Sequence, residues 1–324
     1  MGIDCGGLAP ISEPRGAPKQ RGDPLTGYGA ARYAEAFSAY GTPLELPCSR
    51  SWILERPIPG TPYLDAMGCY PVFTCHDWSK LSEDLEVLSG RVVSLALVTD
   101  AFGNWTEQML RQCFDCVKLF KEHHVYDLTL QPEQYVARSR RRNARRALQR
   151  LRVEVALDPV EHLDEWTALY RVLIQRRRIT GIRAFSALSF AQQLQVPGVT
   201  MLRAFHESRV VAAQLWYVHR DVGYCHLTAG SSLAYTLNAA DALYWSAIQL
   251  FRGRLRWLDI GASAGLASDS SDGLSAFKSG WSTATRPVFF CGRILDPSRY
   301  DEILRERRSL TTNYFPAYRE GEFV

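Results

Sequence analysis

The sequence lacks any apolar run long enough to cross a membrane. Its longest strongly apolar stretch, Val92–Val98, has the length of a strand, whereas a membrane-spanning helix needs about 20 apolar residues. The first 29 residues are rich in glycine and proline and contain no apolar segment of the signal-peptide type. We therefore expect a flexible leader over residues 1–30 and a cytoplasmic protein without a transmembrane segment.

The eight cysteines follow no disulfide or zinc spacing. Without a secretion signal, reduced thiols are expected. The one close pair, Cys113 and Cys116, belongs to an apolar pattern with helical spacing, which predicts that both face the core from a helix over residues 106–121. His123 and His124 follow, but no second cysteine pair completes a zinc site, so we predict no metal ion.

Common nucleotide-binding and hydrolase motifs are also missing. The chain has no glycine-rich phosphate loop, no Ser–His–Asp order and no carboxylate set with metal-ligand spacing. Its 324 residues are 46% hydrophobic and 22% charged, which is typical of a folded globular protein and excludes a disordered or collagen-like chain. This length suggests about two domains.

Strand and helix patterns alternate along the chain after the leader. Three strands in quick succession over residues 200–228, joined by short polar turns, predict an antiparallel meander, and a helix over residues 238–251 follows it. The order of elements predicts an α/β (α+β) fold with a mixed sheet. The other expected strands lie at 92–98, 124–130, 153–157 and 256–260, and the other expected helices at 132–151, 160–176, 186–194 and 297–308.

Positive charge is concentrated in one segment. The net charge is only +4, but residues 138–152 contain eight arginines and no acid, so the rest of the chain is slightly acidic. Apolar residues from Ala144 to Leu151 give this helix one buried stripe. Guanidinium groups bind phosphate in bidentate fashion, so Arg141, Arg142 and Arg145 are candidates for holding a phosphate-bearing ligand. The alternative is a solvated basic helix face.

A second candidate anion site is the start of the helix over residues 238–251. Thr236 and Asn238 stand where a helix N-terminus follows the meander, and such ends attract anions. No glycine is present there, and ordinary helix capping by either residue is the alternative.

Four further side chains are candidates for catalysis. Asp259 stands near the end of an expected strand, and Lys278 follows it and could stabilise a developing oxyanion. Tyr224 and His226 alternate along the third meander strand and are candidate proton acceptors. The alternatives are a turn carboxylate, a surface lysine and packed aromatic rings.

These motifs in this order resemble the Gcn5-related N-acetyltransferase (GNAT) superfamily, in particular the branch of the Fem-type aminoacyltransferases. The chain lacks the Gln/Arg-x-x-Gly-x-Gly/Ala loop of typical acetyl-CoA enzymes. The resemblance implies a GNAT-like fold, with a tandem pair whose first copy is degenerate. The expected parts are an N-terminal GNAT-like or cap domain (31–130), an acyltransferase domain (131–296) and a C-terminal helix and tail (297–324). The matching segments are Arg141–Ala147, Ala212–Ala213, Ala239–Ile248, Asp259–Gly261 and Phe277–Lys278.

The resemblance also implies an activity. We expect an acyltransferase that moves an acyl or aminoacyl group from acyl-CoA or aminoacyl-tRNA, as co-substrate, to a small-molecule or peptidic amine, with no bound cofactor. Lys278 would stabilise the oxyanion, Asp259 would orient the amine, and the arginines would hold donor phosphates. An acyl-CoA-dependent N-acyltransferase and a non-catalytic RNA-binding protein on a decayed transferase fold are the alternatives.

Overall fold

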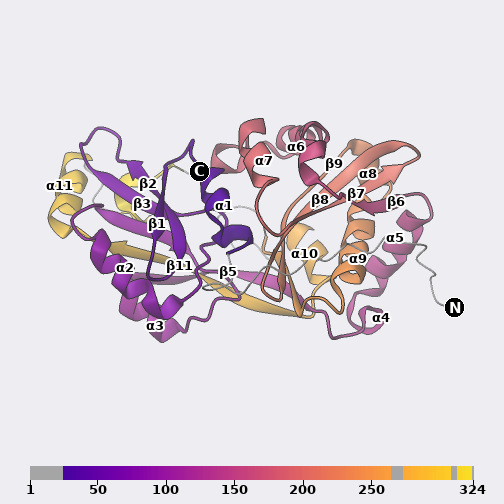
Figure 1. The fold of residues 1–324 in the computed structure, drawn as a ribbon, viewed down its shortest axis with the longest axis horizontal. Helices are drawn as coiled ribbons and strands as arrows, with labels where there is room; N and C mark the ends of the chain where they lie inside the picture. The colour runs from indigo at the N-terminus through magenta and orange to yellow at the C-terminus, as the bar shows by residue number, and fades with distance from the viewer. Residues whose placement is uncertain (1–24, 264–272, 308–311, 323–324) are drawn as a thin grey trace, which may run out of the picture.

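The protein is built on one mixed sheet flanked by helices (Figure 1). The computed structural model describes residues 25–263, 273–307 and 312–322. Within these ranges the sheet has eleven strands in the order β1-β2-β3-β4-β11-β5-β10-β9-β8-β7-β6. The predicted mixed α/β sheet is therefore confirmed, while most of the predicted leader lies outside the described residues.

The predicted meander forms the second half of the sheet. Strands β7 (Val199–His206), β8 (Arg209–His219) and β9 (Val222–Gly230) pair antiparallel in sequence order. Helix α9 (Ala239–Phe251) then carries the chain back, and β10 (Trp257–Gly261) pairs parallel with β9. A parallel neighbour requires such a crossover. The short strand β6, Arg152–Val155, extends this half at its edge.

The first half of the sheet repeats this pairing pattern. Strands β1 (Thr42–Leu46), β2 (Ser51–Pro57) and β3 (Leu64–Gly68) pair antiparallel. Helix α2 (Leu81–Leu88) follows, and β4 (Ser94–Val98) pairs parallel with β3. The same succession of three antiparallel strands, a helix and a parallel strand supports the predicted tandem arrangement with a shortened first copy. The division at residue 130 stays a prediction.

Two long strands join the halves. Strand β5 (Cys116–Asp127) follows the first half along the chain but pairs with β10 of the second half. Strand β11 (Ala284–Ile294) follows the second half but pairs with β4 of the first half. The two strands also pair with each other along most of their length. Each half therefore supplies a strand to the other, and the two halves share one sheet.

The predicted helix over residues 106–121 is wrong beyond its first half. Helix α3 ends at Cys113, Phe114 is extended, and β5 begins at Cys116. The Asp115 carboxylate accepts a hydrogen bond from the Ile294 amide at 2.7 Å, which fixes the chain beside β11. Pairing with a strand distant in sequence thus overrides a local helical pattern, as tertiary contacts commonly do.

Helices cover both faces of the second half. On one face, α1, α6 and α7 cover a core that includes Trp166, Phe190 and Tyr217. On the other face, α5 and α9 pack around Trp216 and Trp281. Every helix in the described ranges is too short or too polar to span a bilayer. The helices not yet bounded are α1 (Ala31–Glu35), α3 (Glu107–Cys113), α4 (Pro132–Tyr135), α5 (Arg138–Leu148), α6 (Leu163–Arg177), α7 (Ala187–Gln193), α8 (Ser232–Thr236), α10 (Gly273–Ser279) and α11 (Pro297–Arg307).

A buried ion pair ties the end of the chain to the first half. Arg319 donates to both carboxylate oxygens of Asp65, at 2.6 and 2.9 Å, and Asp65 is fully buried. Buried Arg56 also lies near this carboxylate, with its Nε 3.4 Å from Asp65 Oδ1, but only Arg319 binds both oxygens. Removing Arg319 therefore leaves a buried charge with one weaker partner, which is strongly destabilising.

We predict that Arg319→Met lowers the free energy of unfolding by about 3 kcal/mol or more, because it leaves the Asp65 carboxylate without its bidentate partner. Urea unfolding measures the loss. The control is Arg32→Ala, which breaks the half-exposed pair with Glu35 and should cost less than about 1 kcal/mol. Equal small losses in the two variants would contradict the structural role of Arg319.

Candidate functional site

The two parallel strands of the second half separate partway along their length. Strands β9 and β10 pair from Val222 and Trp257 as far as Tyr224 and Asp259, and no pairing follows. Beyond this point β9 continues to Gly230 beside β8 only. Among the described residues, no strand lies between the two diverging edges, and the candidate catalytic side chains lie near this point.

Asp259 holds a histidine from the central strand pair. Its carboxylate lies 2.9 and 3.0 Å from Nδ1 of His123 on β5 and accepts a hydrogen bond from the Gly261 amide at 2.7 Å. Because a carboxylate only accepts, Nδ1 carries the hydrogen, and Nε2 of the neutral ring keeps its lone pair. The Asp259 side chain is 4% exposed and that of His123 is 13% exposed, so the histidine is the more accessible member.

A second carboxylate reaches the same strands from the first half of the sheet. Asp100 follows β4 and accepts hydrogen bonds from the Tyr224 hydroxyl at 3.0 and 3.1 Å and from the Phe102 amide at 2.8 Å. Burial raises the pKa of Asp100 to about 6, and the nearby charge of Asp259 adds to this increase. Tyr224 is therefore held by a residue of the first half.

Lys278 lies close to Asp259, because both side chains lie next to the backbone at Gly261 and Ala262. Its Nζ donates to the Ala262 carbonyl at 2.6 Å. Gly261 has a φ of +76°, and a Cβ atom at this position would lie 3.1 Å from the lysine Nζ. The predicted residues Asp259 and Lys278 thus both lie next to Gly261, where a side chain would be strained by the positive φ and would require the lysine to shift. Burial and the charge of Lys278 both lower the pKa of the neighbouring His124.

His226 lies within the aromatic core. Its ring nitrogens are 3.2 Å from the Tyr28 hydroxyl and 3.0 Å from the Gln193 side-chain oxygen. Burial lowers the pKa of His226 to about 3. The ring therefore stays neutral in a packed environment, which is the structural alternative that the sequence left open.

The start of α9 already carries a negative charge of its own. Thr236 is the last residue of α8, and Asn238 precedes α9 with a φ of +54° and no side-chain capping bond. Asp241 lies in the first turn of α9, is buried, and pairs with Arg140 at 3.4 Å. The Asp241 carboxylate therefore already occupies the positive end of the helix dipole, and this makes the start of α9 less favourable for a phosphate.

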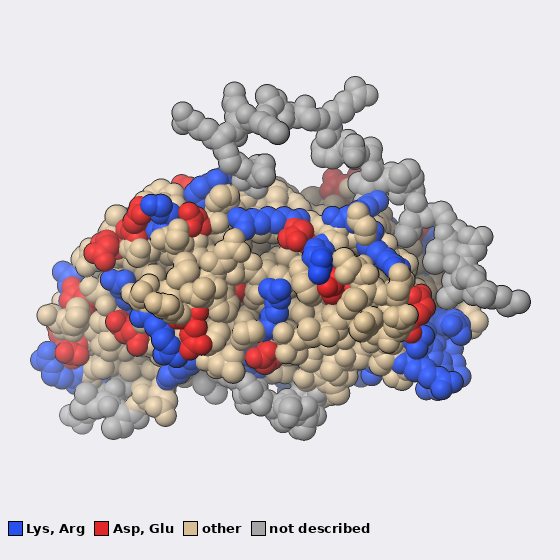
Figure 2. Space-filling model, turned by 90° about the horizontal axis from the view of Figure 1, so that it is seen from below, with Lys and Arg blue, Asp and Glu red and all other residues tan. Residues whose placement is uncertain are grey.

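The arginine helix is shorter than predicted but remains strongly basic. The chain is extended at Val136, so the expected helix divides into α4 and α5. Arg141 turns back to donate to the Val136 carbonyl at 3.0 Å, while Arg142 and Arg145 are exposed. Figure 2 shows a dense group of basic side chains at the end of the molecule where Figure 1 places α5. Ala144 and Ala147 are buried, which confirms the predicted apolar stripe.

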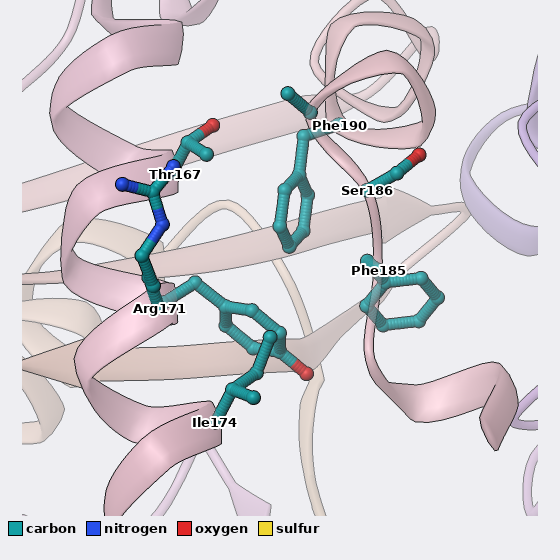
Figure 3. A pocket seen from close by; sticks show the side chains of 8 residues that line it. Thr167, Arg171, Ile174, Phe185, Ser186 and Phe190 are labelled. Atoms are coloured by element: carbon teal, nitrogen blue, oxygen red, sulfur yellow. The ribbon is translucent and has the colours of Figure 1, made fainter. Parts of the chain in front are cut away.

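A cavity of about 200 Å³ lies between α6 and α7, with Tyr170, Phe185 and Phe190 among its walls (Figure 3). Of the candidate residues, His226 packs against the wall residue Phe185, with the two ring centroids 5.9 Å apart. None of the residues predicted to form the site lines it.

Sequence reasoning missed His123 and Asp100. His123 was considered only as part of an incomplete zinc site, because it fell between the helix expected to end at residue 121 and the strand expected to begin at residue 124, whereas β5 begins at Cys116. Asp100 follows the correctly predicted strand at 92–98 directly, so its place at a strand end was the available signal.

Comparison with known proteins identifies the fold. Residues 134–278 match the model of the acetyltransferase (GNAT) domain. A solved structure of FemX is 14% identical and superposes with a TM-score of 0.61 over 85% of this chain and 94% of that chain. The C-terminal domain of a putative lysylphosphatidylglycerol synthetase from Agrobacterium fabrum is 13% identical, with a TM-score of 0.56 over 78% and 85% of the two chains. L-PGS from Bacillus licheniformis is 15% identical, with a TM-score of 0.55 over 89% and 98%.

Residues 134–278 therefore match a GNAT-type domain, and most of the chain has the fold of FemX and of the lysylphosphatidylglycerol synthetase domain. The resemblance to the GNAT superfamily and its Fem branch is confirmed, since the domain model matches residues 134–278 and the fold of FemX superposes on 85% of the chain. A search of curated proteins finds no match.

Because the pKa of Asp100 is raised on folding, we predict that its contribution to the free energy of unfolding depends on pH. Between pH 3.8, the ordinary pKa of an aspartate, and about pH 6, the folded protein holds a proton that the unfolded chain has lost. The contribution of Asp100 to stability therefore falls as the pH rises through this window. Thermal unfolding of the wild type minus that of Asp100→Asn, followed from pH 3.5 to 7, should show this fall. Parallel pH profiles of the two proteins would contradict it.

Proposed function

We propose that the protein transfers an acyl or aminoacyl group from an activated donor to an amine. The observation that carries the proposal is the His123–Asp259 pair, which lies where β9 and β10 separate. An amine must lose a proton when it attacks a carbonyl carbon, and a histidine oriented by a carboxylate is a suited proton acceptor.

The proposed chemistry uses His123, held by Asp259, and Lys278, which both lie near Gly261. The amine nitrogen attacks the carbonyl carbon of the donor, a C–N bond forms, and the bond to the departing oxygen or sulfur breaks. Nε2 of His123 takes the proton that the amine loses and returns it to the leaving atom. The Lys278 ammonium, next to Gly261, would stabilise the negative charge that develops on the donor's carbonyl oxygen. Tyr224 and Asp100 border the same strands and fix the position of β9.

We favour aminoacyl-tRNA as the donor over acyl-CoA. Asp241 disfavours a pyrophosphate at the start of α9, and the chain has no glycine-rich loop to hold one. The exposed arginines of α5 instead suit the many phosphates of a nucleic acid. The neighbours named FemX and lysylphosphatidylglycerol synthetase have the same fold.

A transfer assay tests this proposal. The purified protein is supplied with labelled aminoacyl-tRNA or acyl-CoA, and with ethanolamine or glycylglycine as the amine. A labelled amide supports the proposal, and the donor that yields it defines the class. Binding of tRNA without amide formation would favour the alternative of a non-catalytic RNA-binding protein, in which the His123–Asp259 pair has no role.

We predict that His123→Gln lowers kcat by about 10²-fold or more, since the proton acceptor is removed while the side chain keeps a similar size. Asp259→Asn should also lower kcat, because an amide can donate to Nδ1 and favour the other tautomer of the ring. Steady-state kinetics measure both effects, and circular dichroism checks the fold. Unchanged kcat in both variants would remove the pair from the mechanism.

We predict that Arg142→Gln combined with Arg145→Gln weakens tRNA binding and flattens its salt dependence. Each lost phosphate contact should reduce the slope of log K against log salt by about 0.9 for a duplex. Fluorescence anisotropy at several salt concentrations measures the slope. Arg111→Gln is the matched control, because Arg111 is exposed but pairs with Glu107. A slope equal to that of the wild type would place the tRNA elsewhere.

A further inference from the structure

Arg286 is a half-buried cation that lies over two adjacent aromatic rings, whose centroids are 5.7 Å apart. Its guanidinium carbon lies 4.3 Å from the ring centroid of Phe102 and 4.9 Å from that of Trp257. It also makes a long contact of 3.5 Å with the Ala101 carbonyl. Cation–π attraction to both rings holds the guanidinium near them, and its N–H groups remain able to donate hydrogen bonds.

This cation lies on the same face of the sheet as the proposed proton acceptor. Arg286 on β11 is directly opposite His123 on β5, and directly opposite residues share a face with Cβ atoms about 5 Å apart. The contact with Trp257 agrees with this placement, because Trp257 and Asp259 are two residues apart on β10 and therefore lie on the same face of the sheet. Arg286 and His123 can therefore contact two parts of one small molecule.

No acidic side chain of the described residues forms an ion pair with Arg286. The neighbouring carboxylates have other partners: Asp259 holds His123, and Asp100 accepts from Tyr224. A partly desolvated guanidinium without a counterion is costly unless a ligand supplies the anion. Its rigid fork of donors matches a carboxylate or a phosphate.

We infer that Arg286 binds an anionic group, a carboxylate or a phosphate, that the amine acceptor carries in addition to its amine. The acceptor class is then an amino acid, a short peptide or a phosphorylated amine rather than a simple alkylamine. This inference rests on the proposed function for its location beside His123. Arg286 acts as a specificity residue, and the proton transfer stays with His123.

The test compares pairs of amines that differ in their anionic group. Calorimetry at low salt measures binding of glycylglycine against glycylglycinamide and of O-phosphoethanolamine against ethanolamine. The wild type should bind at least one anionic member about ten-fold more tightly than its neutral counterpart, and the pair that shows this names the anion. Arg286→Gln should remove the preference, and Arg286→Lys, which keeps the charge but not the fork, should reduce it.

The control is Arg256→Gln. Arg256 also contacts Trp257, at 5.3 Å, but it pairs with Asp127 at 2.9 Å, so its loss should leave the preference intact. No preference in the wild type, or a preference that persists in Arg286→Gln, would overturn the inference.

The binding test is independent of turnover. His123→Gln should keep the preference for the anionic amine while losing transfer activity. A binding preference for the anionic amine without amide formation in the wild type would contradict the proposed function but support the anion site. Amide formation with equal use of the anionic and neutral amines would support the proposed function but contradict the anion site.

Discussion

The central pairing of β5 with β11 is the constraint on which the rest of the structure depends. Each of these strands follows one half of the sheet along the chain and pairs with the other half, β5 with β10 and β11 with β4. Separating the halves would break three strand interfaces, so the eleven strands behave as one sheet. The buried pair of Arg319 and Asp65 adds a second tie between the end of the chain and the first half.

This exchange also explains why the candidate site draws on the whole chain. Asp259 belongs to the second half, but its partner His123 lies on the strand that follows the first half. Asp100 reaches Tyr224 from the end of β4, and Arg286 comes from β11. The first half is thus more than a cover, because it supplies groups that orient residues on β9 and β10.

Features governed by local patterns could be predicted from the sequence. The meander, α9 and the basic helix follow from alternation, turn residues and an apolar stripe within short windows. The exchange could not be predicted this way, because residues 116–127 pair with residues 284–294, far away in sequence, and residues 116–121 have helical spacing. His123 was missed because it fell between that expected helix and the strand expected from residue 124, although Asp259 and Lys278 were found. The geometry brings these two together at Gly261, and their catalytic roles stay predictions.

The most direct test of the account is the protonation pattern of His123, measured by nitrogen-15 NMR of labelled histidine. Assignment by comparison with His123→Gln identifies its signals. The account predicts the neutral ring as the tautomer with hydrogen on Nδ1 and a free lone pair on Nε2, with a change of tautomer population in Asp259→Asn. A neutral ring that carries its hydrogen on Nε2 in the wild type would contradict the role of His123 as the proton acceptor.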